Sequence, residues 1–167
     1  ANTGDNGLPS NIYGWSKYVT EQYGIAKIDF KFIGLRYFNV YGPGESHKGK
    51  MASVAHQAHL RGEFKLFDGK PQRDFVYIDD VVDATIYPIF NDVARGVYEV
   101  GSGEARSFED VLELMDIPFE YWHKNNTPKG YQFYTKSSEI KFMNGWKPKY
   151  NLEKGIKKYK EYHNESM

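Results

Sequence analysis

The fold class is decided by KFIGLRYFNVYGPG, residues 31–44. The first part, residues 31–38, is dominated by β-branched and aromatic side chains, which favour a buried strand. The last four residues, YGPG, are turn formers that end the strand. The sequence therefore predicts a buried strand followed by a long loop, and loops that follow strands often carry chemistry.

The segments on both sides of this strand alternate between helix and strand patterns. Residues 10–26 are expected to form an amphipathic helix with Ser10 as its N-cap. Its apolar face consists of Ile12, Trp15, Val19 and Tyr23. Further helices are expected over 51–61, 79–90, 107–115, 137–144 and 152–163, and strands over 64–67, 74–78, 97–100 and 118–122. Asp79 or Asp80 is the expected cap of the helix over 79–90. This alternation predicts an α/β chain with a largely parallel sheet.

The composition of the 167 residues argues against several classes of protein. Lys plus Arg equals Asp plus Glu, at 22 each, so we expect no long-range attraction of nucleic acid or of an anionic membrane surface. Cysteine is absent, which excludes disulfides and thiolate metal sites, and we predict no metal site. No apolar run approaches the roughly 20 residues of a membrane helix, and the polar start does not resemble a signal peptide. We therefore expect a cytoplasmic protein.

Charge is distributed unevenly along the chain. Residues 124–160 hold ten Lys against Glu139 and Glu153, whereas residues 1–123 hold 18 acidic and 12 basic residues. Two interpretations of the lysine-rich stretch remain open. It is either a solvated helix face or an attraction for a phosphorylated substrate.

Two glycine-rich loops match phosphate-binding motifs incompletely. GESHKGK at 44–50 fits G-x-x-x-x-G-K between a predicted strand and a predicted helix, and a P-loop is one alternative for it. Met51 follows, however, and has no hydroxyl for Mg²⁺. GSGEAR at 101–106 begins like a dinucleotide fingerprint, but Arg106 stands where a small residue should let helix and strand approach. We interpret the second loop as a tight strand-to-helix turn.

Tyr13 and Lys17 lie four residues apart, on one face of the first predicted helix. An ammonium beside a phenol helps it to act as a general acid or base. The same spacing occurs at 23/27 and 150/154, so spacing alone does not select the first pair.

Three blocks supply the missing context. They are YGWSK at 13–17, GLRYFNVYGP at 34–43 and RDFVYIDDV at 73–81. In this order and spacing they resemble the extended short-chain dehydrogenase/reductases of the NAD-dependent epimerase/dehydratase family, which modify nucleotide sugars. Residues 34–54, KLFDG at 65–69 and KGYQ at 129–132 are most similar to the ADP-L-glycero-D-manno-heptose 6-epimerases. The resemblance covers essentially the whole chain, but only the carboxyl-terminal half of such an enzyme.

The resemblance implies the carboxyl-terminal part of a Rossmann-type parallel sheet, with an interleaved smaller α/β substrate-binding domain. Residues 1–45 and 73–100 would be the remaining part of the dinucleotide-binding domain. Residues 46–72 and 101–167 would form the substrate-binding domain. The amino-terminal glycine-rich half would be absent, so we expect the chain alone to be inactive and the full-length enzyme to be a homo-oligomer.

The resemblance also implies a reaction. Bound NADP, with NAD as the alternative, would oxidise and then reduce C6 of an ADP-glycero-manno-heptose, a step of lipopolysaccharide core biosynthesis. Tyr13 would be one acid/base, and Lys17 would tune it and bind the nicotinamide ribose. Lys48 would be the second acid/base, on the other face of the sugar. Lys48 and the backbone of Val40 would both touch the cofactor.

The substrate of such an enzyme is an ADP-sugar. Its implied binding residues are Asn39, Lys50, Gln57, Phe67, Asp68, Gly69, Lys70, Arg73 and Tyr131. The planar fork of Arg73 suits a diphosphate, with a salt bridge to Asp74 or Asp79 as the structural alternative. Phe67 and Tyr131 would stack on the adenine or flank the sugar, or simply pack.

The chain departs from the heptose epimerases in a few places. Lys50 and Gln57 stand where Ser and His are favoured, and the arginine expected just before Tyr131 is absent. Two alternative functions therefore remain. One is another UDP- or GDP-sugar epimerase, dehydratase or reductase of the same family. The other is a non-catalytic module that binds a sugar nucleotide.

Overall fold

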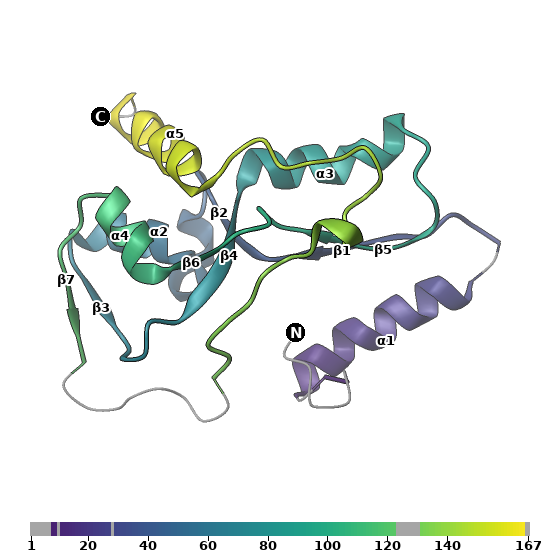
Figure 1. Cartoon of the computed structure of the whole chain (residues 1–167), viewed down its shortest axis with the longest axis horizontal. Coiled ribbons are helices and arrows are strands. Elements are labelled where there is room, and N and C mark those ends of the chain that lie inside the picture. The colour runs from purple at the N-terminus through teal and green to yellow at the C-terminus, as the bar shows by residue number, and fades with distance from the viewer. Residues whose placement is uncertain (1–7, 10, 28, 123–130, 166–167) are drawn as a thin grey trace.

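A computed structural model describes residues 8–9, 11–27, 29–122 and 131–165. Helices and strands alternate along this part of the chain (Figure 1). The helices are α1 (Ile12–Ala26), η1 (Ser46–Met51), α2 (Val54–Arg61), α3 (Ile78–Phe90), α4 (Phe108–Leu114), η2 (Glu139–Lys141) and α5 (Leu152–Glu165), where η denotes a 3-10 helix. The strands are β1 (Ile33–Tyr37), β2 (Asn39–Tyr41), β3 (Phe64–Leu66), β4 (Gln72–Tyr77), β5 (Gly96–Val100), β6 (Ala105–Ser107) and β7 (Phe119–Tyr121).

The strands form three small sheets that are parallel except at one strand. β1 pairs with β5, β2 pairs with β4, and β3 pairs with β7, all in parallel. β6 adds to β4 antiparallel, with Arg73 opposite Arg106. The predicted α/β class and the largely parallel pairing are confirmed. Two strands were not predicted: β2 lies where a loop was expected, and β6 begins within 101–106, so the interpretation of that stretch as a tight strand-to-helix turn is wrong.

Helices α2 and α3 begin at other residues than the sequence predicted. α2 starts later than predicted because Ser53 caps it, with its Oγ accepting a hydrogen bond from the His56 N–H at 3.2 Å. α3 follows β4 directly and has Tyr77 at its N-cap, so the prediction that Asp79 or Asp80 caps it is wrong. Both carboxylates lie in the first helical turn instead, where they offset the positive end of the helix dipole.

The other predicted boundaries are close to the observed ones. Asn11 is the N-cap of α1, and its side chain accepts a hydrogen bond from the Gly14 N–H at 2.7 Å. Ser10, the predicted cap, lies outside the described residues. The helix predicted over 137–144 is reduced to the single turn of η2.

Strand β4 is buried on both faces and separates two apolar clusters. Phe75 and Tyr77 point to the cluster beneath α4 and α5, together with Tyr41 of β2. Val76 points the opposite way, into the cluster formed with α3 and with Trp146. Side chains alternate along a strand, so consecutive residues of β4 supply both clusters.

The carboxylate of Asp74 joins β4 to two distant segments. Its Oδ1 accepts hydrogen bonds from the Ser102 backbone N–H at 2.6 Å and from the Ser102 hydroxyl at 2.8 Å. Its Oδ2 accepts from the backbone N–H groups of Gly103 and Ser137, at 3.1 and 2.9 Å, and from the Ser137 hydroxyl. A Cβ on Gly101 would lie 2.4 Å from the Ser137 Oγ, so only glycine fits between them.

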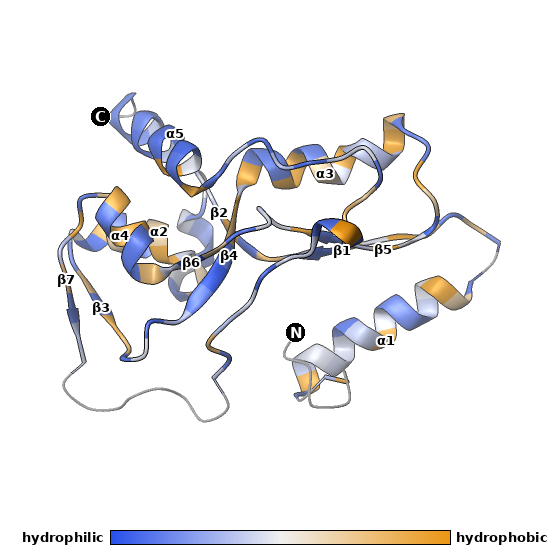
Figure 2. Cartoon of the chain, in the orientation of Figure 1, coloured by the Kyte–Doolittle hydropathy of each residue, from blue (hydrophilic) through white to orange (hydrophobic). Residues whose placement is uncertain are grey.

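The lysine-rich stretch pairs with the acidic part of the chain. Lys149 lies 2.8 Å from Asp83, and Lys158 lies 2.9 Å from Asp79. The strongly hydrophilic outer side of α5 is visible in Figure 2. These ion pairs favour the interpretation of a solvated helix face over an attraction for substrate.

Helix α1 lies to one side of β1 and β5 (Figure 1), and Glu21 of α1 accepts hydrogen bonds from Arg36 of β1. Ile12 is 90% exposed and Val19 is 58% exposed, whereas Gly14 and Gly24 are buried. Hydrogen bonds hold the carboxyl end of α1, where Arg95 donates to the carbonyl oxygens of Gly24 and Ile25. Among the described residues, no helix combines the length and the apolar character of a membrane span.

Substituting Asp74 with alanine should leave buried donors without an acceptor. We expect the free energy of unfolding to fall by about 3 kcal/mol or more, because each hydrogen bond to a charged group contributes roughly 1.5–3 kcal/mol. Chemical denaturation measures the change. Asp92→Ala is the control, because Asp92 is fully exposed and its ion pair among the described residues is with the exposed Lys31, so we expect no detectable change. Equal losses in the two variants would contradict this account.

The contact between α2 and α5 should make stability depend on pH. The His163 ring lies 4.1 Å from that of His59 and 4.5 Å from that of Tyr159. Burial, together with His59 and His56 nearby, lowers the pKa of His163 below its ordinary value of 6.5. The unfolded chain therefore binds the proton more tightly, so this stability is complete above about pH 6.5 and is lost as pH falls below it.

Denaturation at several pH values between 5 and 8 checks this expectation. His163→Phe should flatten the loss of unfolding free energy at acidic pH, because the ring that resists protonation is gone. His47→Gln is the matched control, since His47 is exposed, and it should retain the wild-type slope. An unchanged slope in His163→Phe would show that other groups cause the acid sensitivity.

Candidate functional site

A pocket of about 240 Å³ lies where β2 and β4 end. Its lining consists of Val40, Tyr41, Gly42, Pro43, Gly44, Glu45, His47, Lys48 and Ile78. In open α/β sheets, ligands bind beyond the carboxyl ends of parallel strands, and this pocket occupies that position. Two residues singled out from the sequence, Val40 and Lys48, meet here.

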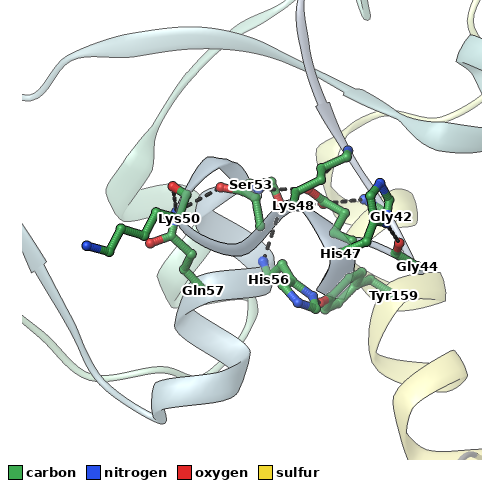
Figure 3. Close-up of polar contacts among 11 residues, drawn as sticks. Gly42, Gly44, His47, Lys48, Lys50, Ser53, His56, Gln57 and Tyr159 are labelled. Carbon is green, nitrogen blue, oxygen red and sulfur yellow. Dashed lines mark hydrogen bonds and ion pairs between the residues drawn. The ribbon is translucent and has the colours of Figure 1, made fainter.

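The loop that carries Lys48 is organised by the buried side chain of Glu45. One carboxylate oxygen accepts hydrogen bonds from the Gly42 N–H at 3.3 Å and from the Ser53 hydroxyl at 2.6 Å. The other accepts from the Ser53 N–H at 2.7 Å and from Lys48 Nζ at 3.4 Å. Figure 3 shows Lys48 and Ser53 on this loop, next to the start of α2. No sequence pattern singled out Glu45, because a carboxylate in a loop is usually solvated.

Lys50 and Gln57 are brought together at the first turn of α2. The Gln57 amide nitrogen donates hydrogen bonds to the backbone oxygens of Lys50 at 3.3 Å and of Ala52 at 2.8 Å. Gln57 therefore fixes the end of the loop, while the side chain of Lys50 is exposed (Figure 3).

A second group of predicted residues gathers around Arg73. Its guanidinium lies 4.9 Å from the centre of the Tyr131 ring, and Phe67 packs edge-on against the same ring at 5.9 Å. The ring of Phe108 lies 6.0 Å from the guanidinium on another side, a neighbour that the sequence did not indicate. Three predicted substrate residues are thus in one cluster, which we call the arginine–aromatic cluster (Phe67, Arg73, Phe108, Tyr131).

The guanidinium of Arg73 makes hydrogen bonds with backbone oxygens. It donates to the carbonyl oxygen of Gln72 at 2.8 Å and to that of Gln132. The acids proposed as salt-bridge partners are engaged elsewhere, since Asp74 binds the turns described above and Asp79 pairs with Lys158. Two of the five guanidinium N–H donors are therefore used internally by these bonds.

The predicted run 67–70 forms the exposed turn between β3 and β4. Gly69 has φ +96°, and a Cβ there would lie 2.7 Å from the ring of Phe133. Lys70 has φ +46° and is exposed together with Asp68. Phe133 in turn contacts Tyr131 at 5.5 Å, so the turn adjoins the arginine–aromatic cluster.

The predicted catalytic residues fall into two groups. Tyr13 and Lys17 are both exposed on α1, with Lys17 Nζ 5.3 Å from the centre of the Tyr13 ring. Within the part of the chain that the structure describes, α1 contributes no residue to the pocket that contains Lys48. Asn39 is exposed at the start of β2. No cluster of His, Asp or Glu among the described residues is arranged to hold a metal ion.

Comparison with known proteins assigns the chain to a family. The model of the NAD dependent epimerase/dehydratase family matches residues 2–101. The chain belongs to this family. The family resemblance read from YGWSK, GLRYFNVYGP and RDFVYIDDV is therefore confirmed.

Curated relatives of this member of the family include two ADP-L-glycero-D-manno-heptose-6-epimerases. The one from Brachyspira hyodysenteriae is 35% identical and covers 93% of this chain and 55% of its own length. The one from Fusobacterium nucleatum is 33% identical and covers 91% and 54%. The chain thus spans about half the length of the curated relatives that it matches.

Solved structures confirm the Rossmann-like α/β fold. Helicobacter pylori ADP-L-glycero-D-manno-heptose-6-epimerase superposes with a TM-score of 0.79 at 30% identity, over 98% of this chain and 55% of that one. Thermotoga maritima UDP-glucose 4-epimerase with UDP-glucose superposes with a TM-score of 0.77 at 31% identity, over 97% and 57%.

Proposed function

We propose that this chain is the carboxyl-terminal portion of an enzyme that inverts C6 of an ADP-glycero-manno-heptose. The observation that carries the proposal is the match to two curated ADP-heptose 6-epimerases over more than nine tenths of the chain. The parent would act in the cytoplasm, in lipopolysaccharide core synthesis, as a homo-oligomer. Its dinucleotide-binding part would include residues 1–45 and 73–100, and its substrate-binding part residues 46–72 and 101–167.

Tyr13 is the first proposed acid/base. Its ring and the ammonium of Lys17 are neighbours on α1, and both are exposed, so the phenol hydroxyl is accessible to a sugar. The ammonium of Lys17 lies beside the phenol and can also hold a ribose hydroxyl.

Lys48 is the second proposed acid/base. Its ammonium lies in the pocket beyond β2 and is partly exposed, so it can meet a ligand there. An inversion through a planar ketone needs a proton donor on each face of the sugar. Tyr13 lies on α1 and Lys48 on the loop after β2, and we assign one of them to each face of the sugar.

The pocket also suits one end of a nicotinamide cofactor. Its single Lys ammonium and the backbone of Val40 are donors and acceptors of the kind that hold a carboxamide and a ribose. When bound, NADP, or NAD as the alternative, would supply the oxidation and re-reduction of the sugar carbon. Lys17, Val40 and Lys48 are the residues of this chain that we assign to holding it.

The arginine–aromatic cluster is the proposed site for the ADP group. The guanidinium of Arg73 has five N–H donors, and its hydrogen bonds within the described residues use two of them, so we assign the others to diphosphate oxygens. The rings of Phe67 and Tyr131 offer faces for the adenine or the sugar. The remaining proposed substrate residues are Asn39, Lys50, Gln57, Asp68, Gly69 and Lys70.

A UDP-sugar epimerase is the second candidate. The observation that favours it is the similarity to the Thermotoga maritima UDP-glucose 4-epimerase, at 31% identity. Lys48 distinguishes the two candidates, because an enzyme with different chemistry on the second sugar face would tolerate its loss. A non-catalytic module that binds sugar nucleotides is the third.

An activity assay tests the leading candidate. The chain is joined to the amino-terminal part of the Brachyspira hyodysenteriae relative, and the interconversion of the two ADP-heptose epimers is followed. We expect Tyr13→Phe with Lys48→Met to lower kcat by at least about 100-fold, because general acid–base groups contribute 10²–10⁴-fold. Tyr23→Phe is the control, as it has the same spacing to Lys27. Full activity of the double variant, or conversion of UDP-glucose instead, would overturn the assignment.

Calorimetry on this chain tests the nucleotide-sugar site separately. We expect saturable binding of ADP-glucose at the arginine–aromatic cluster and no detectable binding of NADP, because the residues assigned to the cofactor, Lys17, Val40 and Lys48, would contact only one end of it. Arg73→Lys should weaken the binding about tenfold, since an ammonium cannot bind two oxygens as a planar fork does. Arg61→Lys, on the exposed end of α2, should bind like the wild type. Binding of NADP without binding of ADP-glucose would contradict the assignment of the arginine–aromatic cluster to the ADP group.

A further inference from the structure

We propose that Glu45 is the positioning residue for Lys48: its buried carboxylate holds the ammonium from behind and clamps the loop that presents it. The inference rests on the role proposed for Lys48. It adds a residue that neither the sequence motifs nor the family resemblance indicated.

Burial and hydrogen bonding together fix the carboxylate of Glu45. The residue is 3% exposed, although it lies in a loop. Both of its oxygens are engaged, one by the Gly42 N–H and the Ser53 hydroxyl, and the other by the Ser53 N–H and Lys48 Nζ. A buried carboxylate with these partners cannot rotate without leaving donors unsatisfied.

The ion pair between Glu45 and Lys48 determines which side of the Lys48 ammonium remains open to a ligand. Among the described residues, Lys48 is the cation that forms an ion pair with Glu45, at 3.4 Å. Separating the two would leave a buried negative charge without its counter-charge, which is strongly unfavourable. The side chain of Lys48 is 38% exposed and that of Glu45 is 4% exposed, so one side of the ammonium faces the carboxylate and another remains open to a ligand.

Tyr159 of α5 is a titratable group close to Glu45. Burial, and secondarily Glu45, raises the pKa of Tyr159, so this phenol stays neutral. Its hydroxyl lies 3.3 Å from His56 Nδ1, beneath the loop (Figure 3).

The same carboxylate connects the pocket to α2. Ser53 donates its hydroxyl to Glu45 and accepts the N–H of His56, so the clamp and the helix cap share one side chain. At the other end, Gly42 must approach α3 closely, because a Cβ there would lie 2.3 Å from Ile78 Cγ2. Glu45 thus holds Lys48 between two fixed points, Gly42 and Ser53.

Lys50 provides an internal comparison. It lies two residues beyond Lys48 in η1 and is exposed, and no ion pair involves it among the residues that the structure describes. If Glu45 acts through Lys48, removal of its charge should change Lys48 and leave Lys50 unchanged. If Glu45 only shapes the loop, both lysines should change together.

Competitive acetylation of this chain separates these possibilities. Trace acetic anhydride is added at pH 8, and acetylation of each lysine is measured by mass spectrometry. In the wild type we expect Lys48 to react several-fold more slowly than Lys50, because an ammonium held in an ion pair is a poor nucleophile. In Glu45→Gln the rate at Lys48 should rise by about threefold or more while the rate at Lys50 stays constant. Glu104→Gln, an exposed acid elsewhere, should change neither rate.

Two results would overturn the proposal. One is an unchanged rate at Lys48 in a folded Glu45→Gln variant, and the other is an equal rise at both lysines. Ser53→Ala provides a second test if Glu45→Gln does not fold, because it loosens the clamp but keeps the carboxylate beside Lys48. Lys48 should remain protected in that variant, and loss of its protection would assign the effect to the loop alone.

Kinetics of the joined enzyme distinguish failure of this inference from failure of the proposed function. Glu45→Gln should lower kcat about tenfold with KM for the ADP-heptose changed by less than about twofold, and it should add no further loss to Lys48→Met. A full additional loss in the double variant would overturn the positioning role. An unaffected kcat in Lys48→Met would instead overturn the proposed function, while the acetylation result would still decide whether Glu45 holds Lys48.

Discussion

The burial of residues 73–77 of β4, with the carboxylate of Asp74 among them, determines how the other segments pack around this strand. Five hydrogen bonds to one carboxylate compensate for removing it from water. They also connect β4 to the 101–103 turn and to Ser137, which are far apart in sequence. Because side chains alternate along the strand, the placement of Asp74 directs its neighbours Arg73 and Phe75 to the opposite face, where the arginine–aromatic cluster forms.

The pairing of β2 with β4 has a similar consequence for the pocket. Two parallel strands end side by side, and the loop after β2 folds back over the start of α3. A loop in such a place needs partners for its backbone, and the buried carboxylate of Glu45 supplies them. The same group that completes the loop also faces the ammonium of Lys48, so the local structure of the loop and the electrostatics of the pocket have one origin.

Local patterns predicted only part of this site. Helical spacing made Tyr13 and Lys17 one of three candidate pairs, and only the family resemblance selected them. Lys48 and Arg73 had no such local signal and entered through the resemblance to a family. Glu45 was missed altogether, since its burial comes from Ser53, eight residues later, and from the pairing of β2 with β4. The apolar face of α1 was predicted correctly as a pattern, yet in this structure it faces outward.

The sequence by itself determined the alternation of helices and strands, the α/β class and the family, because these depend on residue type and short-range periodicity. It could not determine that Asp79 and Asp80 lie inside a helical turn and cap nothing, or that β6 pairs antiparallel with β4. Tertiary structure alone decided that Phe67, Arg73 and Tyr131 share one cluster and that Glu45 lies behind Lys48. The physical reason is that burial and hydrogen bonding between distant segments are properties of the packed chain, and no local stretch of sequence contains them.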